Sequence, residues 1–239
     1  PVEALEFNGL ATARLVESAR QAGVHRFIYV STAHVYSSPL TGTVNEDICP
    51  RNLHPYATSH LAGENAVLSA SQQGQIEGVI LRLSNAFGAP VYKDVNCWML
   101  LVNDLCRQSI QTRKMVLKSS GLQHRDFIAM TEVNRVIEYF SSCDLASSID
   151  PIFNVGLGNS QSVRDMAQLI QNRCKVILGF EPRFTYQESR TGGNNEELKY
   201  SQKRMQKMGV EVENKNNIEI DDLLIFCRDS FNQVMDKRI

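Results

Sequence analysis

The sequence predicts an α/β protein, and three features of its 239 residues support this class. Apolar residues at helical spacing alternate along the chain with short runs rich in β-branched and aromatic residues. The order strand, helix, strand in the first half is that of a βαβ unit. Neither internal repeats nor low-complexity tracts interrupt the alternation. A hydrophobic content of 43% is enough for one large domain, or for one domain with a small lobe.

The first predicted elements form the βαβ unit. Residues 9–22 carry apolar positions at helical spacing and end at Gly23, a residue typical of a helix C-terminus. HRFIYVST, residues 25–32, has the pattern of a buried parallel strand. A stretch rich in Pro, Gly and Thr follows, then a helix over about 56–70 and the strand VILRLS over 79–84.

The rest of the chain continues the alternation. In chain order we predict a helix over 95–108, a strand over 115–118, a helix over 131–142, a strand over 152–156, a helix that begins at the capping-box-like pair Ser162 and Asp165, a strand over 183–187 and a closing helix over 218–236.

Composition argues against several classes of function. Lys and Arg total 25 and Asp and Glu total 26, so the net charge of -1 gives no electrostatic footprint for nucleic acid or an anionic membrane. No apolar run approaches the roughly 18 residues of a membrane span, and no signal peptide is recognisable, so we expect a soluble cytoplasmic protein. The 6 cysteines form no C-x-x-C pair and the histidines show no metal-ligand spacing, so we expect reduced thiols and no metal site.

Two sequence patterns bear on cofactor binding. Gly156-x-Gly158 follows a predicted strand, but Gln161 stands where a third glycine of a dinucleotide-binding turn would be, and a structural turn is the favoured interpretation. No other GxxGxxG or Walker A pattern occurs. The chain also opens at Pro1 directly on a helix-like pattern, so we expect a piece of a longer protein whose phosphate-binding turn lies outside this sequence.

A catalytic hypothesis comes from two segments. Ser31 and Thr32 end a predicted parallel strand, at the edge where open α/β sheets bind ligands. Tyr56 opens the next helix, and His60 follows at i+4 on the same face. A hydroxyl, a phenol and a basic group would suit proton transfer beside a nicotinamide. Taken alone, Y-x-x-x-H is weak, and an ordinary helix N-terminus is the favoured reading.

Five segments in order change this balance, because together they resemble the extended short-chain dehydrogenase/reductase family, the nucleotide-sugar epimerases and dehydratases. The resemblance runs nearly end to end and rests on RFIYVSTAHVYSS, NEDICPRNLHPYATSHLAGE, LRLSNAFGAP, QHRDFIAMTEV and FNVGLGNSQSVRDMAQLI. It implies a doubly wound, Rossmann-like parallel sheet that lacks its N-terminal βαβ portion, with a smaller C-terminal α/β substrate lobe. Residues 1–90 would be the C-terminal part of the NAD(P)-binding domain, and 91–239 mainly the substrate lobe, with 115–156 partly returning to the sheet.

The resemblance also implies roles at the catalytic and cofactor end. Tyr56 is similar to the family's proton-transfer tyrosine and Thr32 to its hydroxyl partner, with Ser31 as a neighbour that could substitute. Asn8 resembles the asparagine near the nicotinamide of NAD or NADP. His60 stands where the family has lysine; a histidine is shorter and carries its charge only when protonated.

Substrate-binding residues follow from the same resemblance. Asn85 and Arg125 resemble positions that hold a nucleotide diphosphate-sugar, and Arg190 resembles an arginine that clamps a phosphate. Family dehydratases carry an Asp-Glu pair directly after the catalytic threonine, whereas this chain has Ala33 and His34. This argues against 4,6-dehydration, although His34 could act as an acid or base.

The resulting functional hypothesis is an NAD(P)-dependent nucleotide-sugar epimerase or reductase that uses a tyrosine acid/base. The alternative, motivated by His60 and the missing glycine turn, is a non-catalytic nucleotide-sugar-binding member of the family. The resemblance further implies a homodimer formed through a two-helix face.

Overall fold

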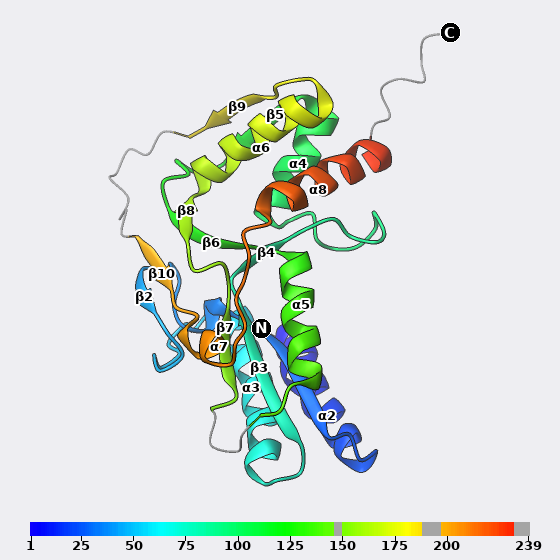
Figure 1. Ribbon diagram of the computed structural model, residues 1–239, viewed down its shortest axis with the longest axis vertical. Helices are drawn as coiled ribbons and strands as arrows, with labels where there is room; N and C mark the ends of the chain where they lie inside the picture. Colours follow the sequence, from blue (N-terminus) through cyan, green and yellow to red (C-terminus); the bar gives the residue numbers. More distant parts are fainter. Residues whose placement is uncertain (146–149, 188–196, 232–239) are drawn as a thin grey trace. The chain divides into compact units, whose positions relative to one another are not determined.

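The computed structural model describes residues 1–145, 150–187 and 197–231 (Figure 1). The chain divides into two compact units. The first comprises Pro1–Ser84, Val133–Gly158 and Leu198–Val212, and the second comprises Asn85–Glu132, Asn159–Glu197 and Glu213–Ile239. The assignment of cofactor and substrate roles to residues 1–90 and 91–239 stays a prediction.

A parallel sheet forms the centre of the first unit. Its strands are β1 (Arg26–Thr32), β3 (Glu77–Leu83) and β7 (Ile152–Val155), in the order β1-β3-β7. Helix α3 (Pro55–Gln72) connects β1 to β3 and packs on both strands (Figure 1). This is the predicted βαβ unit, and it brings the carboxyl end of β1 and the first turn of α3 into the same unit.

Shorter elements complete the first unit. They are α1 (Val2–Ala4), the π-helix η1 (Leu5–Leu10), α2 (Ala11–Gln21), the 3-10 turn η2 (Ala33–Val35), β2 (Gly42–Val44), α5 (Met130–Ser142, from Val133 on), β10 (Leu198–Tyr200) and α7 (Lys203–Lys207). Strand β10 pairs in parallel with β2. The core between α2, α3 and the sheet contains Val16, Val67 and Ile80, so burial of these apolar faces holds the helices on the sheet.

The second unit is built on short strands and three longer helices among its described residues. Its elements are β4 (Asn85–Phe87), α4 (Leu101–Thr112), β5 (Lys114–Leu117), β6 (His124–Ala129), β8 (Ser160–Ser162), α6 (Val163–Leu178), β9 (Arg183–Tyr186) and α8 (Asn216–Phe231). Strand β6 lies between β4, in parallel, and β8, antiparallel, while β5 pairs with β9. Helices α4, α6 and α8 share one apolar core.

The structure corrects some predicted boundaries and confirms a cap. The helix predicted over 95–108 begins only at Leu101, because residues 92–100 form turns in which the Trp98 indole donates to the Lys93 carbonyl. The predicted capping box is present: Ser162 accepts from the Asp165 backbone, and the Asp165 carboxylate accepts from Ser162. Helix α6 ends at Gly179, whose φ of 71° is the left-handed conformation that glycine tolerates.

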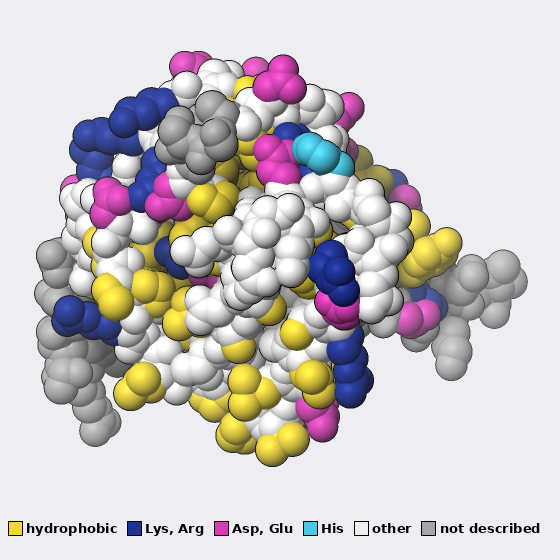
Figure 2. All heavy atoms as spheres, turned by 90° about the horizontal axis from the view of Figure 1, so that it is seen from below, with side chains coloured by type: hydrophobic (Ala, Val, Ile, Leu, Met, Phe, Trp, Pro, Cys, Tyr) yellow, Lys and Arg dark blue, Asp and Glu magenta, His cyan; other side chains and the backbone are white. Residues whose placement is uncertain are grey.

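Surface properties match the balanced composition. On the face drawn in Figure 2, basic and acidic side chains are interspersed, and hydrophobic side chains lie between them. Within the part of the chain that the structure describes, no helix combines the length and apolar character needed to cross a bilayer.

Candidate functional site

The carboxyl end of β1 delivers Thr32 to the first unit's candidate site. Thr32 is 6% exposed, and its backbone is extended before the chain turns into η2. Its hydroxyl oxygen accepts a hydrogen bond from the His34 backbone N–H at 3.2 Å. The hydroxyl therefore caps the turn that follows the strand, which fixes the position of its oxygen.

Ser31 belongs to a buried polar network instead. Its hydroxyl donates to Glu64 at 2.5 Å, and Glu64 also receives two hydrogen bonds from Arg82, at 2.9 and 2.6 Å. Ser31 and Arg82 are each 3% exposed and Glu64 is fully buried. Because a buried carboxylate needs such partners, the network fastens α3 to β1 and β3, and the Ser31 proton is committed to Glu64.

Tyr56 lies in the first turn of α3, and neighbouring residues fix this turn. Pro55 occupies the first helical turn, and the His54 ring nitrogen accepts from the Tyr56 backbone N–H at 3.2 Å. The Tyr56 side chain is 44% exposed. Its ring centroid lies 4.6 Å from that of His60 and 6.5 Å from that of His34, edge-on in both cases. The structure thus brings a phenol together with two imidazoles near the capped Thr32.

His60 is partly buried, and its surroundings affect its charge. Burial lowers the pKa of His60 below its ordinary value of 6.5, and the Glu64 carboxylate opposes this shift in part. The ring is therefore mostly neutral at pH 7. A charged His60, the state in which it would resemble the family's lysine, requires more acidic conditions.

Asn8 reaches the same helix from η1. Its side-chain amide donates to the Ser59 hydroxyl at 3.0 Å, and Ser59 in turn donates to the Tyr56 carbonyl at 2.9 Å. Asn8 therefore ties the π-helix to the first turns of α3. The predicted contact of Asn8 with a nicotinamide stays a prediction.

Asn85 and Arg125 lie on neighbouring strands of the second unit. Asn85, in β4, donates to the Asp126 carbonyl of β6 at 2.9 Å, and Arg125 precedes that residue. Burial lowers the pKa of Arg125. Within the described ranges, the Arg125 guanidinium has no carboxylate partner. Arg190 lies outside the described residues.

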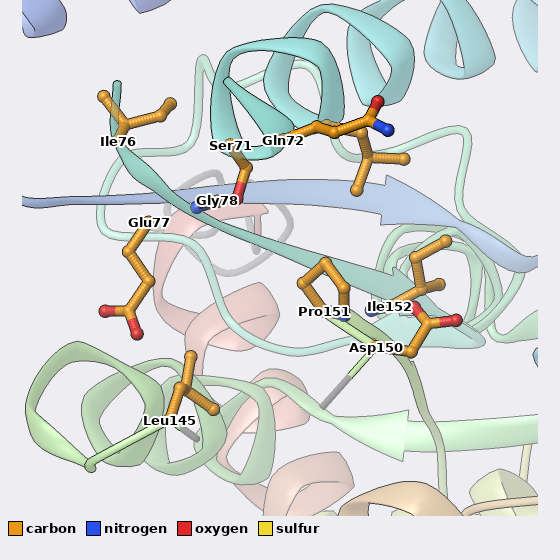
Figure 3. Close-up of a pocket in the computed structure, with 10 residues that line it drawn as sticks. Ser71, Gln72, Ile76, Glu77, Gly78, Leu145, Asp150, Pro151 and Ile152 are labelled. Atoms are coloured by element: carbon orange, nitrogen blue, oxygen red, sulfur yellow. Dashed lines mark hydrogen bonds between the residues drawn. The ribbon is translucent and has the colours of Figure 1, made fainter. Parts of the chain in front are cut away.

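A hollow of about 690 Å³ lies at a different end of the first unit (Figure 3). It is lined by the C-terminal end of α3 and by the residues that start β3 and β7, including Ser71, Glu77 and Ile152. The Ser71 hydroxyl accepts from the Gly78 N–H at 3.1 Å at its wall. Because Thr32 and Tyr56 sit at the opposite ends of β1 and α3, this hollow is separate from the candidate site.

Sequence reasoning missed the residues beneath the site. Tyr29 places its hydroxyl 3.3 Å from Nδ1 of His60, and Glu64 and Arg82 anchor the helix that carries Tyr56. The signal available was the inward alternation of β1, which predicts that Tyr29 and Ser31 share a face. Their partners His60 and Glu64, 31 and 33 positions away, could not be identified from the sequence.

The residues present fit one part of a dinucleotide cofactor. An exposed phenol, a capped threonine and an imidazole at the carboxyl end of a parallel strand suit the nicotinamide half. The sequence supplies no GxxGxxG turn for the pyrophosphate. Among the described residues, no cluster of three or more His, Cys, Asp or Glu could hold a metal ion.

The fold and this site together define a Rossmann-type α/β protein with a threonine and tyrosine site at the sheet edge. The model of the NAD dependent epimerase/dehydratase family matches residues 1–156, and the chain belongs to this family. The predicted membership of this family is thereby confirmed.

Individual relatives illustrate the match. The human dTDP-D-glucose 4,6-dehydratase is 33% identical over 174 residues, which cover 71% of this chain and 47% of that protein. The chain therefore spans about half the length of this human protein and of its mouse counterpart.

Solved structures support the fold. MoeE5 in complex with UDP-glucose and NAD gives a TM-score of 0.72 at 24% identity and covers 93% of this chain and 71% of that one. The UDP-glucuronic acid 4-epimerase from Bacillus cereus, in complex with UDP-glucuronic acid and NAD, gives 0.74 at 21% identity, with 93% and 67% covered. These similarities confirm the predicted Rossmann-like fold class.

Proposed function

We propose that the protein containing this chain is an NAD(P)-dependent nucleotide-sugar epimerase or reductase whose acid/base group is Tyr56. The observation that supports it most is the arrangement at the carboxyl end of β1, where the half-exposed Tyr56 lies against His60 and beside the turn capped by Thr32. The names of relatives and of structurally similar complexes, which include epimerases and a reductase, support the same class.

Tyr56 moves the proton in this mechanism. Its phenolate oxygen accepts the proton of a sugar hydroxyl as the C–H bond on the same carbon breaks, and the C–O bond becomes a carbonyl. A nicotinamide held beside Tyr56 and Thr32 would supply the hydride acceptor and, in an epimerase, the hydride donor for the opposite face of the sugar. Tyr56 then gives the proton back to the oxygen. The Thr32 hydroxyl donates to that oxygen and holds it in line with Tyr56.

Dehydration is disfavoured by the residues that follow Thr32. Ala33 is 1% exposed and has no ionisable group, so it cannot supply the acid that expels water from the sugar. His34 is held through its backbone: its N–H donates to Thr32 and its carbonyl accepts from the Asn52 amide at 2.7 Å. The chain thus differs from the dehydratases that it is similar to at the position where that chemistry requires an acid.

The proposed substrate is a nucleotide diphosphate-sugar. Arg125 supplies a partly buried cation without a carboxylate partner in the described ranges, which suits a phosphate, and Asn85 lies on the neighbouring strand β4. Arg190 is proposed as a second phosphate ligand by family resemblance alone.

A second candidate is a non-catalytic nucleotide-sugar-binding protein. The observation that favours it is the state of His60: a mostly neutral imidazole does not promote ionisation of Tyr56 as the family's lysine cation does. Such a protein would bind the substrate through the second unit without turning it over.

The test is incubation of the full-length product of this reading frame with NAD and a panel of UDP-, dTDP- and GDP-sugars, followed by proton NMR. A new sugar configuration would support the epimerase, and oxidation or reduction matched to the cofactor would support a reductase. Binding by calorimetry without turnover would favour the second candidate. Neither binding nor turnover with any sugar would contradict both.

A further inference from the structure

A second tyrosine lies beneath the proposed catalytic pair. Tyr29, from the middle of β1, places its hydroxyl oxygen 3.3 Å from Nδ1 of His60 and 3.3 Å from the Asn8 carbonyl oxygen. The Tyr29 and His60 rings are 6.1 Å apart and tilted by 49°. The sequence alone does not predict that Tyr29 contacts His60 and Asn8. No step of the proposed mechanism uses Tyr29.

The Tyr29 phenol has a single proton to donate, and this restricts the tautomer of His60. Burial raises the pKa of Tyr29 to about 12, so the hydroxyl keeps its proton at physiological pH. Its neighbours are the Asn8 carbonyl, the Thr12 side chain and the His60 ring. A carbonyl can only accept, whereas a hydroxyl and an imidazole can donate. If the phenol proton goes to Asn8, the bond to His60 requires a proton on Nδ1.

Two features of the fold position the Asn8 carbonyl beside Tyr29. Asn8 lies in a π-helical turn, a distortion that is frequent at functional sites, and Ala11 donates to Glu6 across five positions there. Gly63 of α3 faces the contact: a Cβ at this position would overlap the Tyr29 hydroxyl and lie 2.5 Å from the Asn8 oxygen. A glycine is therefore needed for Tyr29 and Asn8 to meet beneath His60.

We propose that Tyr29 is a positioning residue that, together with the Asn8 carbonyl, holds His60 in the tautomer with a proton on Nδ1 and a free lone pair on Nε2. The inference rests on the proposed function in one respect, because it describes how a histidine is accommodated where the family has lysine. The charged and titratable groups around the ring are Tyr29, Tyr56 and Glu64. In this state the His60 ring lies against Tyr56 without a positive charge.

The test reads the tautomer directly and needs no substrate. Two-bond ¹H–¹⁵N correlation spectra of the full-length protein, labelled with ¹⁵N-histidine and recorded at pH 8, show which nitrogen carries the proton. The chain has 5 histidines, and His60→Gln assigns the signal of interest. We expect a single Nδ1–H pattern for His60 in the wild type and, in Tyr29→Phe, a shift toward the Nε2–H form that histidine prefers in water.

Tyr36→Phe is the matched control. It also removes one buried hydroxyl, which donates to Asn154 at 2.8 Å, and should leave the His60 pattern unchanged. An Nε2–H pattern in the wild type would overturn the proposal even if Tyr29→Phe did not fold. An Nδ1–H pattern that persists in a folded Tyr29→Phe would overturn the role of Tyr29. Because the spectra report no turnover, either result is separable from failure of the proposed function.

Discussion

His60 is the residue on which the proposed activity depends most sharply. By the family resemblance it stands where lysine is expected, four residues after Tyr56, and its burial favours the neutral ring. An imidazole that stays neutral near pH 7 places no positive charge beside Tyr56, whereas a lysine ammonium would.

Replacing His60 by lysine should therefore increase turnover. We expect His60→Lys to raise kcat at pH 8 by about tenfold, or about 1.4 kcal/mol of barrier, because a permanent cation stabilises negative charge near the Tyr56 oxygen. The measurement is the rate of sugar conversion in the full-length protein. His25→Lys, at a side chain that is 86% exposed, is the control and should leave kcat unchanged. Equal rates for wild type and His60→Lys would contradict the prediction that a positive charge at position 60 increases turnover.

The lowered pKa of His60 also predicts a pH dependence of stability. At pH values below the ordinary 6.5 the unfolded chain binds a proton that the folded chain resists, so the free energy of unfolding decreases as the pH falls from about 7 toward the folded-state pKa. Urea titrations at pH 5 to 8 should show this slope in the wild type and a smaller one in His60→Gln. Parallel curves for the two proteins would contradict the shift.

At this scale the sequence predicted part of the site. Thr32, Tyr56 and His60 were predicted as neighbours because strand ends and helix starts are readable from local pattern, and the structure places Tyr56 against His60; their catalytic roles stay predictions. Tyr29 and Glu64 were not, since their roles come from contacts with His60 and Ser31 across 31 and 33 positions. Only docking of α3 on the sheet creates those contacts.

At the scale of elements, α3 is the support of the site. Its first turn is fixed by Pro55 and the His54 cap, and its middle is fixed to the sheet through Glu64 and the close approach at Gly63. A small shift of this helix would move Tyr56 and His60 together, so its packing should affect both stability and activity.

Gly63→Ala tests that packing. A methyl group at this position has no space between the Tyr29 hydroxyl and the Asn8 carbonyl, so we expect a loss of about 1 to 3 kcal/mol in the free energy of unfolding despite the better helix propensity of alanine. Gly9→Ala is the matched control: its Cβ would lie 3.3 Å from the Ala62 Cβ, and the expected change is within about 1 kcal/mol. Similar effects at both positions would show that Gly63 has no special contact.

Long elements with local sequence signals were predicted better than short ones. The long periodic helix α3 was predicted within a few residues at both ends, and the Ser162 cap marked the start of α6. Strands β4, β8 and β10, each of three residues, were missed because so short a run carries no periodicity and depends on its partner strand. Strand β6 was overlooked although its segment carried one of the family matches.

At the scale of the whole molecule, the α/β class and the Rossmann-like fold are confirmed, and membership of the family is shown by the match over residues 1–156. On the face drawn in Figure 2, acidic and basic side chains are mixed, in keeping with the net charge of -1. Residues 115–156 were expected to return partly to the sheet, whereas no local signal indicated that 198–212 belong to the first unit, because that grouping is a long-range property.

The most direct measurement is the turnover of Tyr56→Phe in the full-length protein, with NAD and the nucleotide-sugar that the wild type converts. Tyr56 is half exposed at the start of α3, so the substitution removes one oxygen without disturbing the core. We predict a decrease in kcat of about 100-fold or more with the fold unchanged by circular dichroism, because general acid/base catalysis contributes that much. Tyr92→Phe, at a side chain that is 72% exposed, serves as the control. Full activity in Tyr56→Phe would contradict the assignment of the proton to this residue.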